Sequence, residues 1–117
     1  MAEPVKIETF QLDAGLSRIR VEGSLSSLNI VRLEAAIQGV FARGIYRLVV
    51  NLKGATSISS EGLGCFISAH LTAIKNGGRV ILAATPSSIK DAFNLVGLSN
   101  VLSFADSEGR AREEWGR

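Results

Sequence analysis

The sequence predicts a single α/β domain built on a mixed, mostly parallel sheet of four to five strands with about four helices. Three observations support this fold class. Two alternating segments open the chain, apolar segments of strand length then alternate with segments of helical periodicity, and the 117 residues contain no repeat, low-complexity tract or linker. Strands that alternate with helices are typical of layered α/β sheets with right-handed crossovers.

The first two segments predict a hairpin with one solvated face. Residues 5–10 and 16–22 alternate between apolar and polar side chains, and Asp13-Ala14-Gly15 between them is a turn signal. A helix follows, with its core positions at helical spacing and Gly44 as its expected end. Serine is a preferred helix cap, so Ser26 and Ser27 are expected to cap this helix. The predicted core positions are Ile30, Leu33, Ile37 and Phe41.

The second half continues the alternation. Residues 45–52 and 79–84 are almost entirely apolar, which is typical of parallel strands buried on both faces. A helix is expected over about 60–75, a short helix from about 87 to 96, a short edge strand over 101–104, and a polar helix over 106–115. The expected core of the helix over 60–75 is Leu63, Phe66, Ile67, Leu71 and Ile74, and that of the short helix is Ile89, Phe93 and Val96.

Composition excludes several classes of function. The apolar fraction of 46% suits a packed core, and the net charge of +2 comes from interspersed acids and bases, so nucleic acid is a poor expectation. The single cysteine forms no internal disulfide. No signal peptide, membrane span, metal-ligand set or cofactor motif is predicted, which favours a cytoplasmic domain without cofactors.

The segment Ser57–Gly64 is the candidate site. It follows an apolar strand and opens a helix, and in open α/β sheets ligands and partners meet the protein at such junctions. A helix N-terminus also favours negative charge, including phosphate. From the local sequence alone, Ser59 and Ser60 are either helix caps or functional hydroxyls, and Gly62 and Gly64 are expected to allow close packing of the helix start on the sheet.

The ordered set of motifs resembles the STAS domain, in particular the small bacterial anti-sigma factor antagonists. The resemblance covers about residues 5–112 within a single domain of 1–117. It is carried by Gly23-Ser24-Leu25, Leu48-Val49-Val50-Asn51-Leu52, Ile58-Ser59-Ser60-Glu61-Gly62-Leu63-Gly64, Gly77-Gly78-Arg79-Val80-Ile81-Leu82 and Phe93-Asn94-Leu95-Val96-Gly97-Leu98.

The resemblance implies a protein-binding switch without catalysis of its own. Family members bind an anti-sigma factor, which is also a serine kinase of the GHKL type and inactivates them by phosphorylating one serine. That position falls on Ser60, and a phosphatase would reverse the modification. Partner-binding residues are then expected at Leu25, Ser26, Leu28, Ser57, Ser59, Glu61 and Gly62. Neither nucleic acid nor membrane is an expected partner, and the protein is expected to be a monomer or weak dimer.

Two departures from the family pattern keep an alternative open. Ser59 and Ser26 stand where the family usually carries aspartate, so the chain is also interpreted as a scaffold or sensor that is not phosphorylated, in a signalling or lipid-transport complex. A hydrolase with Ser60 as nucleophile would need His70, the single histidine, as its base. Ten residues of helix span about 15 Å, which is too far for a hydrogen bond.

Overall fold

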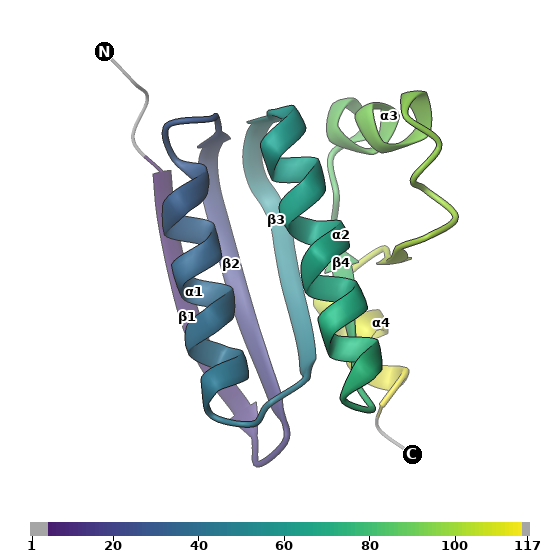
Figure 1. Ribbon diagram of the computed structural model, residues 1–117. Coiled ribbons are helices and arrows are strands. Elements are labelled where there is room, and N and C mark those ends of the chain that lie inside the picture. The colour runs from purple at the N-terminus through teal and green to yellow at the C-terminus, as the bar shows by residue number, and fades with distance from the viewer. Residues whose placement is uncertain (1–4, 116–117) are drawn as a thin grey trace.

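A five-stranded sheet forms the centre of the protein in the computed structural model, which describes residues 5–115 (Figure 1). The strands lie in the order in which they occur along the chain. The first two are antiparallel, and every other neighbouring pair is parallel. The predicted mixed, mostly parallel sheet is therefore confirmed. Its strands are β1 (Val5–Asp13), β2 (Leu16–Leu25), β3 (Arg47–Ile58), β4 (Arg79–Ala83) and β5 (Ser103–Ala105).

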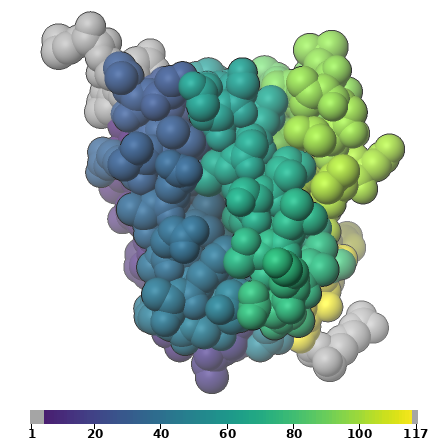
Figure 2. Space-filling view, in the orientation of Figure 1, coloured from purple at the N-terminus to yellow at the C-terminus, as the bar shows by residue number. Residues whose placement is uncertain are grey.

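Within residues 5–115, four helices cover the two faces of the sheet unequally. Helices α1 (Ile30–Ala42), α2 (Ser60–Lys75) and α3 (Ser87–Leu95) pack on one face, and the short α4 (Glu108–Glu113) lies on the other. Figure 2 shows α1 and α2 side by side across the first face. Strand β3 contributes to both layers, because Leu48, Val50 and Leu52 join the main core while Val49 joins a smaller cluster with Ile81 and Ala111. The expected burial of this strand on both faces is confirmed.

Strands β2 and β3 extend further than the apolar pattern predicts. β3 begins at Arg47 rather than at residue 45 and continues through polar residues to Ile58, and β2 continues to Leu25. Backbone hydrogen bonds continue the pairing whatever the side chains are, and two irregularities in register accommodate the extra residues. Ser57 therefore lies at the end of a strand, opposite Ser24, and not in a loop.

The core-facing side of α2 also differs from the prediction. Leu63 and Phe66 are buried as expected, but Leu71 and Ile74 are each 52% exposed. Ala69, His70 and Ala73 are buried in their place. The two small alanines allow α2 to lie close to the sheet, and the Nδ1 atom of His70 accepts a hydrogen bond from the Val80 backbone amide of β4 at 3.3 Å. In α3, Ile89 and Phe93 are buried as predicted, but Val96 is exposed.

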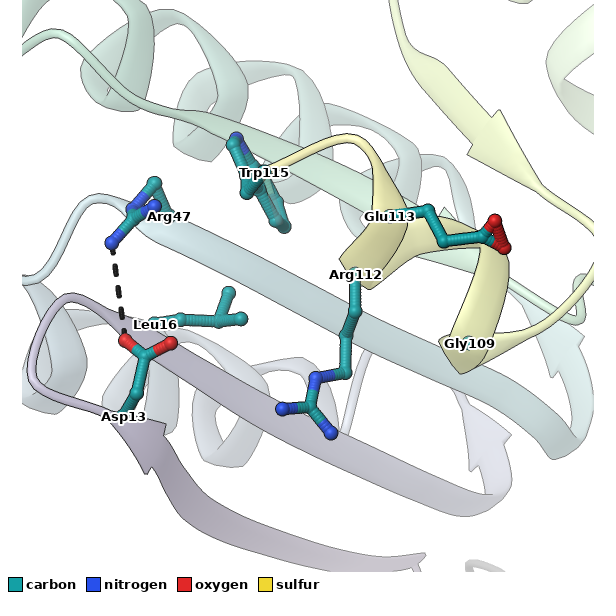
Figure 3. Close-up of a pocket in the computed structure, with 7 residues that line it drawn as sticks. All are labelled: Asp13, Leu16, Arg47, Gly109, Arg112, Glu113 and Trp115. Carbon is teal, nitrogen blue, oxygen red and sulfur yellow. Dashed lines mark ion pairs between the residues drawn. The ribbon is translucent and has the colours of Figure 1, made fainter. Parts of the chain in front are cut away.

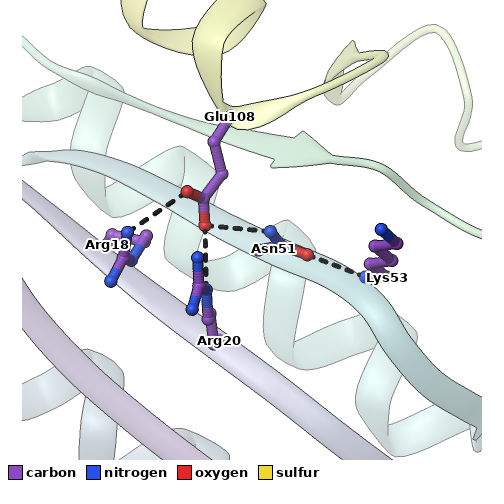
Figure 4. Close-up of polar contacts among 5 residues, drawn as sticks. All are labelled: Arg18, Arg20, Asn51, Lys53 and Glu108. Atoms are coloured by element: carbon purple, nitrogen blue, oxygen red, sulfur yellow. Dashed lines mark hydrogen bonds and ion pairs between the residues drawn. The ribbon is translucent and has the colours of Figure 1, made fainter.

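A polar cluster fixes α4 to the sheet (Figure 4). The Glu108 carboxylate accepts hydrogen bonds from Arg18 Nη1 at 3.2 Å, Arg20 Nε at 3.3 Å and Asn51 Nδ2 at 2.9 Å. The Asn51 amide oxygen in turn accepts a bond from the Lys53 backbone amide at 2.8 Å. Burial alone would raise the pKa of Glu108. The hydrogen bonds from Asn51 and Arg20 and the positive charges of Arg18 and Arg20 outweigh this effect, so the pKa of Glu108 lies below its ordinary value. The carboxylate thus stays charged and holds the first turn of α4.

Candidate functional site

The parallel pairing of β2 with β3 brings together the two loops that form the candidate site. The strands end at the same edge of the sheet, where Leu25 lies opposite Ile58. The backbone amide of Ser59 donates to the Leu25 carbonyl oxygen at 2.9 Å, and the hydroxyls of Ser24 and Ser57 share a hydrogen bond of 2.6 Å. The loop that precedes α1 therefore lies beside the first turn of α2.

The two adjacent serines at the start of α2 have different roles. Ser59 is the N-cap residue, and its hydroxyl oxygen accepts a hydrogen bond from the Gly62 backbone amide at 3.2 Å. Ser60 is the first helical residue and is exposed, and its hydroxyl makes no hydrogen bond within residues 5–115. The cap interpretation thus holds for Ser59, while the Ser60 hydroxyl is exposed to solvent.

Glu61 carries the negative charge of this first turn. A bond from its own backbone amide lowers the pKa of its carboxyl group, and hydroxyl bonds from Ser27 and Ser59 lower it further. Glu61 is therefore ionised at neutral pH, at the end of the helix where the macrodipole favours a carboxylate.

The expected capping of α1 by Ser26 and Ser27 is wrong. The N-cap residue is Asn29, in a helical conformation, and its side-chain amide donates to the Ser24 carbonyl oxygen at 2.9 Å. Ser26 contributes its backbone oxygen, which accepts from the amides of Asn29 and Ile30. Its hydroxyl oxygen is buried and has no partner within the described residues. A tight backbone turn thus starts α1 without a serine hydroxyl.

Two residues expected to contact a partner are buried instead. The Leu25 side chain is fully buried in the main core. Gly62 is also buried, and a Cβ atom there would lie 2.6 Å from the Ile58 Cγ1 atom. This confirms the packing interpretation of Gly62 and removes both residues from the accessible surface. Gly64 is different, because it is exposed with open space around the position of a Cβ atom.

An apolar patch adjoins the serines. Leu28 is 75% exposed, as a partner-contacting residue should be, and Val31, in the first turn of α1, is 66% exposed. Val31 is not among the residues that the sequence predicts at a partner surface. The available signal was its position three residues after Leu28 and outside the core spacing of the helix. Ser57 and Glu61 are also exposed, so polar groups border the patch.

The arrangement at this edge suits binding rather than acid–base catalysis. His70 is buried against β4 and accepts a backbone hydrogen bond, and burial lowers the pKa of its ring, with a further contribution from the charge of Arg79. It is therefore not a base for Ser60. Between Val5 and Trp115, no group of three or more His, Cys, Asp or Glu side chains could hold a metal ion, and no helix is long and apolar enough to cross a membrane.

Comparisons with known proteins agree with this geometry. The family model of the STAS domain matches residues 10–111. The fold is similar to that of a putative anti-sigma factor antagonist from Thermotoga maritima, with 18% sequence identity, 95% of each chain covered and a TM-score of 0.87. It is also similar to that of an anti-sigma factor antagonist from Mycobacterium paratuberculosis, with 20% identity, 100% of each chain covered and a TM-score of 0.86.

A third similar structure exists in a modified state. The phosphorylated form of the Bacillus cell fate determinant SpoIIAA has 18% sequence identity to this chain, with 94% of this chain and 99% of that chain covered and a TM-score of 0.75. At these identities the structural likeness supports the fold, and the match to the family model supports the family.

Proposed function

The chain belongs to the STAS domain family, and from this premise we propose that it is an anti-sigma factor antagonist that is switched off by phosphorylation of Ser60. The partner would be an anti-sigma factor that is also a serine kinase of the GHKL type, with a separate phosphatase restoring the active form. Such a switch would operate in the cytoplasm.

The observation that carries the proposal is the exposed Ser60 hydroxyl beside an exposed apolar patch. Leu28 and Val31 offer apolar surface for a partner to bury, and Ser60 lies at the start of α2, which the Ser59–Leu25 backbone bond holds beside the loop that precedes α1. Exposed apolar residues bordered by polar groups are typical of interaction sites. We define the docking face as the exposed residues Leu28, Val31, Ser57, Ser60 and Glu61. Ser26 and Ser59 contribute indirectly, because their oxygens accept the backbone hydrogen bonds that begin α1 and α2.

Phosphorylation would act on this face through its charge. A phosphoserine adds about −1.5 to −2 charges and three acceptor oxygens. The N-terminus of α2 tolerates this charge in the free protein, but Glu61 is already ionised beside it. A partner that covers the face would have to remove water from both anions. Leaving one charge buried and unpaired costs several kcal/mol, so the complex is expected to weaken by roughly a hundredfold or more.

The proposal is tested with a candidate anti-sigma kinase and ATP. Mass spectrometry should find one phosphate on Ser60, and none on the Ser60→Ala variant. Calorimetry should show that Ser60→Ala binds the kinase as the unmodified protein does, and that Ser60→Asp binds roughly a hundredfold more weakly. The matched control is Ser68→Asp, which adds the same charge at an exposed position of α2 outside the docking face and should bind the kinase as the unmodified protein does. Phosphate found only on a residue other than Ser60, or full binding by Ser60→Asp, contradicts the proposal.

One observation favours the second candidate, a STAS scaffold or sensor that accepts no phosphate. The Ser59 hydroxyl is used as a helix cap and the Ser26 hydroxyl is buried, so neither position supplies the carboxylate that the family usually carries there. In that case kinases of this class leave the protein unmodified, and affinity purification recovers transporter subunits or a large signalling particle in place of a single kinase.

A further inference from the structure

A pocket of about 350 Å³ lies between α4 and the sheet, at the opposite end of β3 from Ser60. Its walls come from Asp13, Leu16, Arg47, Arg112, Glu113 and Trp115 (Figure 3). A strand rises about 3.3 Å per residue, so the twelve residues of β3 separate this pocket from the docking face by roughly 35 Å. The pocket plays no part in the proposed switch.

One side of the pocket is apolar and fixed in place. Leu16 is 3% exposed and belongs to the small core cluster under α4, against which Leu12 and Trp115 pack. The Trp115 ring also contacts Arg79, whose guanidinium lies 5.9 Å from the ring centroid and forms an ion pair with Glu114. A flat apolar group could therefore lie against a preformed wall, which is the usual form of a small-molecule site.

Four charged side chains line the pocket, and of these only Asp13 and Arg47 form an ion pair with each other. Arg47 is 3.8 Å from the Asp13 carboxylate and donates from Nε to the Gly15 carbonyl oxygen at 3.2 Å, so the charges of Arg47 and Asp13 offset each other. Arg112 and Glu113 both line the pocket, and Figure 3 shows that their side chains extend in different directions, with Arg112 directed toward the strand that carries Leu16. Within residues 5–115, Arg112 makes no ion pair or side-chain hydrogen bond.

We propose that this pocket binds a small organic anion with an apolar body, such as an aromatic carboxylate or sulfonate. The anionic group would pair with Arg112, and the apolar body would lie against Leu16 and Trp115. A guanidinium offers paired donors that match the geometry of carboxylate and sulfonate oxygens. A volume of about 350 Å³ is at the lower end of the range for ligand pockets, which suits a molecule of one or two rings.

The test uses the aromatic sulfonate ANS and its uncharged analogue N-phenyl-1-naphthylamine as probes. Trp115 is the only tryptophan of the chain, so its fluorescence reports binding at the pocket directly. ANS is expected to quench Trp115 with saturation, and Arg112→Gln is expected to weaken ANS binding by roughly tenfold or more without changing the affinity for the uncharged analogue.

Arg110→Gln is the matched control, because Arg110 is an exposed arginine of the same helix that does not line the pocket. This variant should bind ANS as the unmodified protein does, and so should Ser60→Asp. Circular dichroism checks that each variant is folded. Equal ANS affinity for Arg112→Gln and Arg110→Gln, or competition by inorganic phosphate as strong as by an aromatic carboxylate, overturns the proposal.

Discussion

Replacing Ser59 and Ser60 separately by alanine should separate helix capping from switching. The two serines are adjacent, but only the Ser59 hydroxyl accepts a bond from the helix, namely from the Gly62 amide. The Ser60 hydroxyl is exposed and makes no hydrogen bond within the part of the chain that the structure describes. We therefore expect Ser59→Ala to reduce stability and Ser60→Ala to leave it nearly unchanged.

The expected loss in free energy of unfolding depends on which hydrogen bond each variant removes. Removing a serine N-cap costs about 0.5–2 kcal/mol. Gly62 is buried, so its amide has little access to water once the hydroxyl is gone, which places the cost of Ser59→Ala at about 1–2 kcal/mol. For a domain of this size each kcal/mol lowers the melting temperature by roughly 3–6 °C. Ser60→Ala removes no contact and should stay within about 0.5 kcal/mol of the unmodified protein.

Thermal and urea unfolding, followed by circular dichroism, measure both effects. Ser59→Asn is the control, because asparagine caps helices about as well as serine and should restore stability. Partner binding gives the complementary result, since Ser59→Ala should retain binding at temperatures where it is folded. If Ser60→Ala loses as much stability as Ser59→Ala, the Ser60 hydroxyl is a structural group and the reasoning about an open switch is refuted.

Three further predictions test the rest of the fold. Burial lowers the pKa of His70 in the folded protein below its ordinary value of 6.5, so just below pH 6.5 the unfolded chain binds more protons than the folded protein does. The free energy of unfolding should therefore fall as the pH drops through about 6.5. Urea unfolding should show that His70→Gln lacks this dependence. Burial, with the charge of Glu34, raises the pKa of the Cys65 thiol to about 11 from 9.0, so at pH 8 it should react with a disulfide reagent roughly a hundredfold more slowly than in urea; equal rates would contradict the assignment. Glu108→Ala leaves Arg18 and Asn51 without their shared acceptor and should cost about 1–3 kcal/mol in urea unfolding, whereas Glu108→Gln, which keeps an oxygen acceptor, should cost less.

The order of the elements could be predicted because it depends on local periodicity. The segments around Ile19, Leu33 and Val50 show their strand or helix periods within a few residues, and all three side chains are buried as expected. The rotation of α2 about its axis could not be predicted in the same way. Leu71 and Ile74 fit a helical stripe as well as His70 and Ala73 do, and the close approach of α2 to β4 decides between them.

The start of α2, where the candidate site lies, was predictable, but the exposure of its neighbouring residues was not. Ser60 lies at the start of α2 as expected, because a strand followed by serine, glutamate and an apolar stripe is a strong helix-start signal. Which neighbours reach the surface depends on tertiary pairing. Leu25 and Gly62 are buried because β2 continues beside β3 to the edge of the sheet, and no local pattern indicates that extension.

The way Glu108 reaches back to Arg18 has a consequence for how the protein is made. The two residues are 90 positions apart, so the face of the sheet that α4 covers stays open to solvent until synthesis has passed residue 108. Until then no helix covers the apolar side chains on this face, which can associate with other nascent chains. These side chains are Leu16, Val49 and Ile81. A truncation before residue 107 should therefore yield a product that aggregates, although helices α1, α2 and α3 on the opposite face of the sheet are intact.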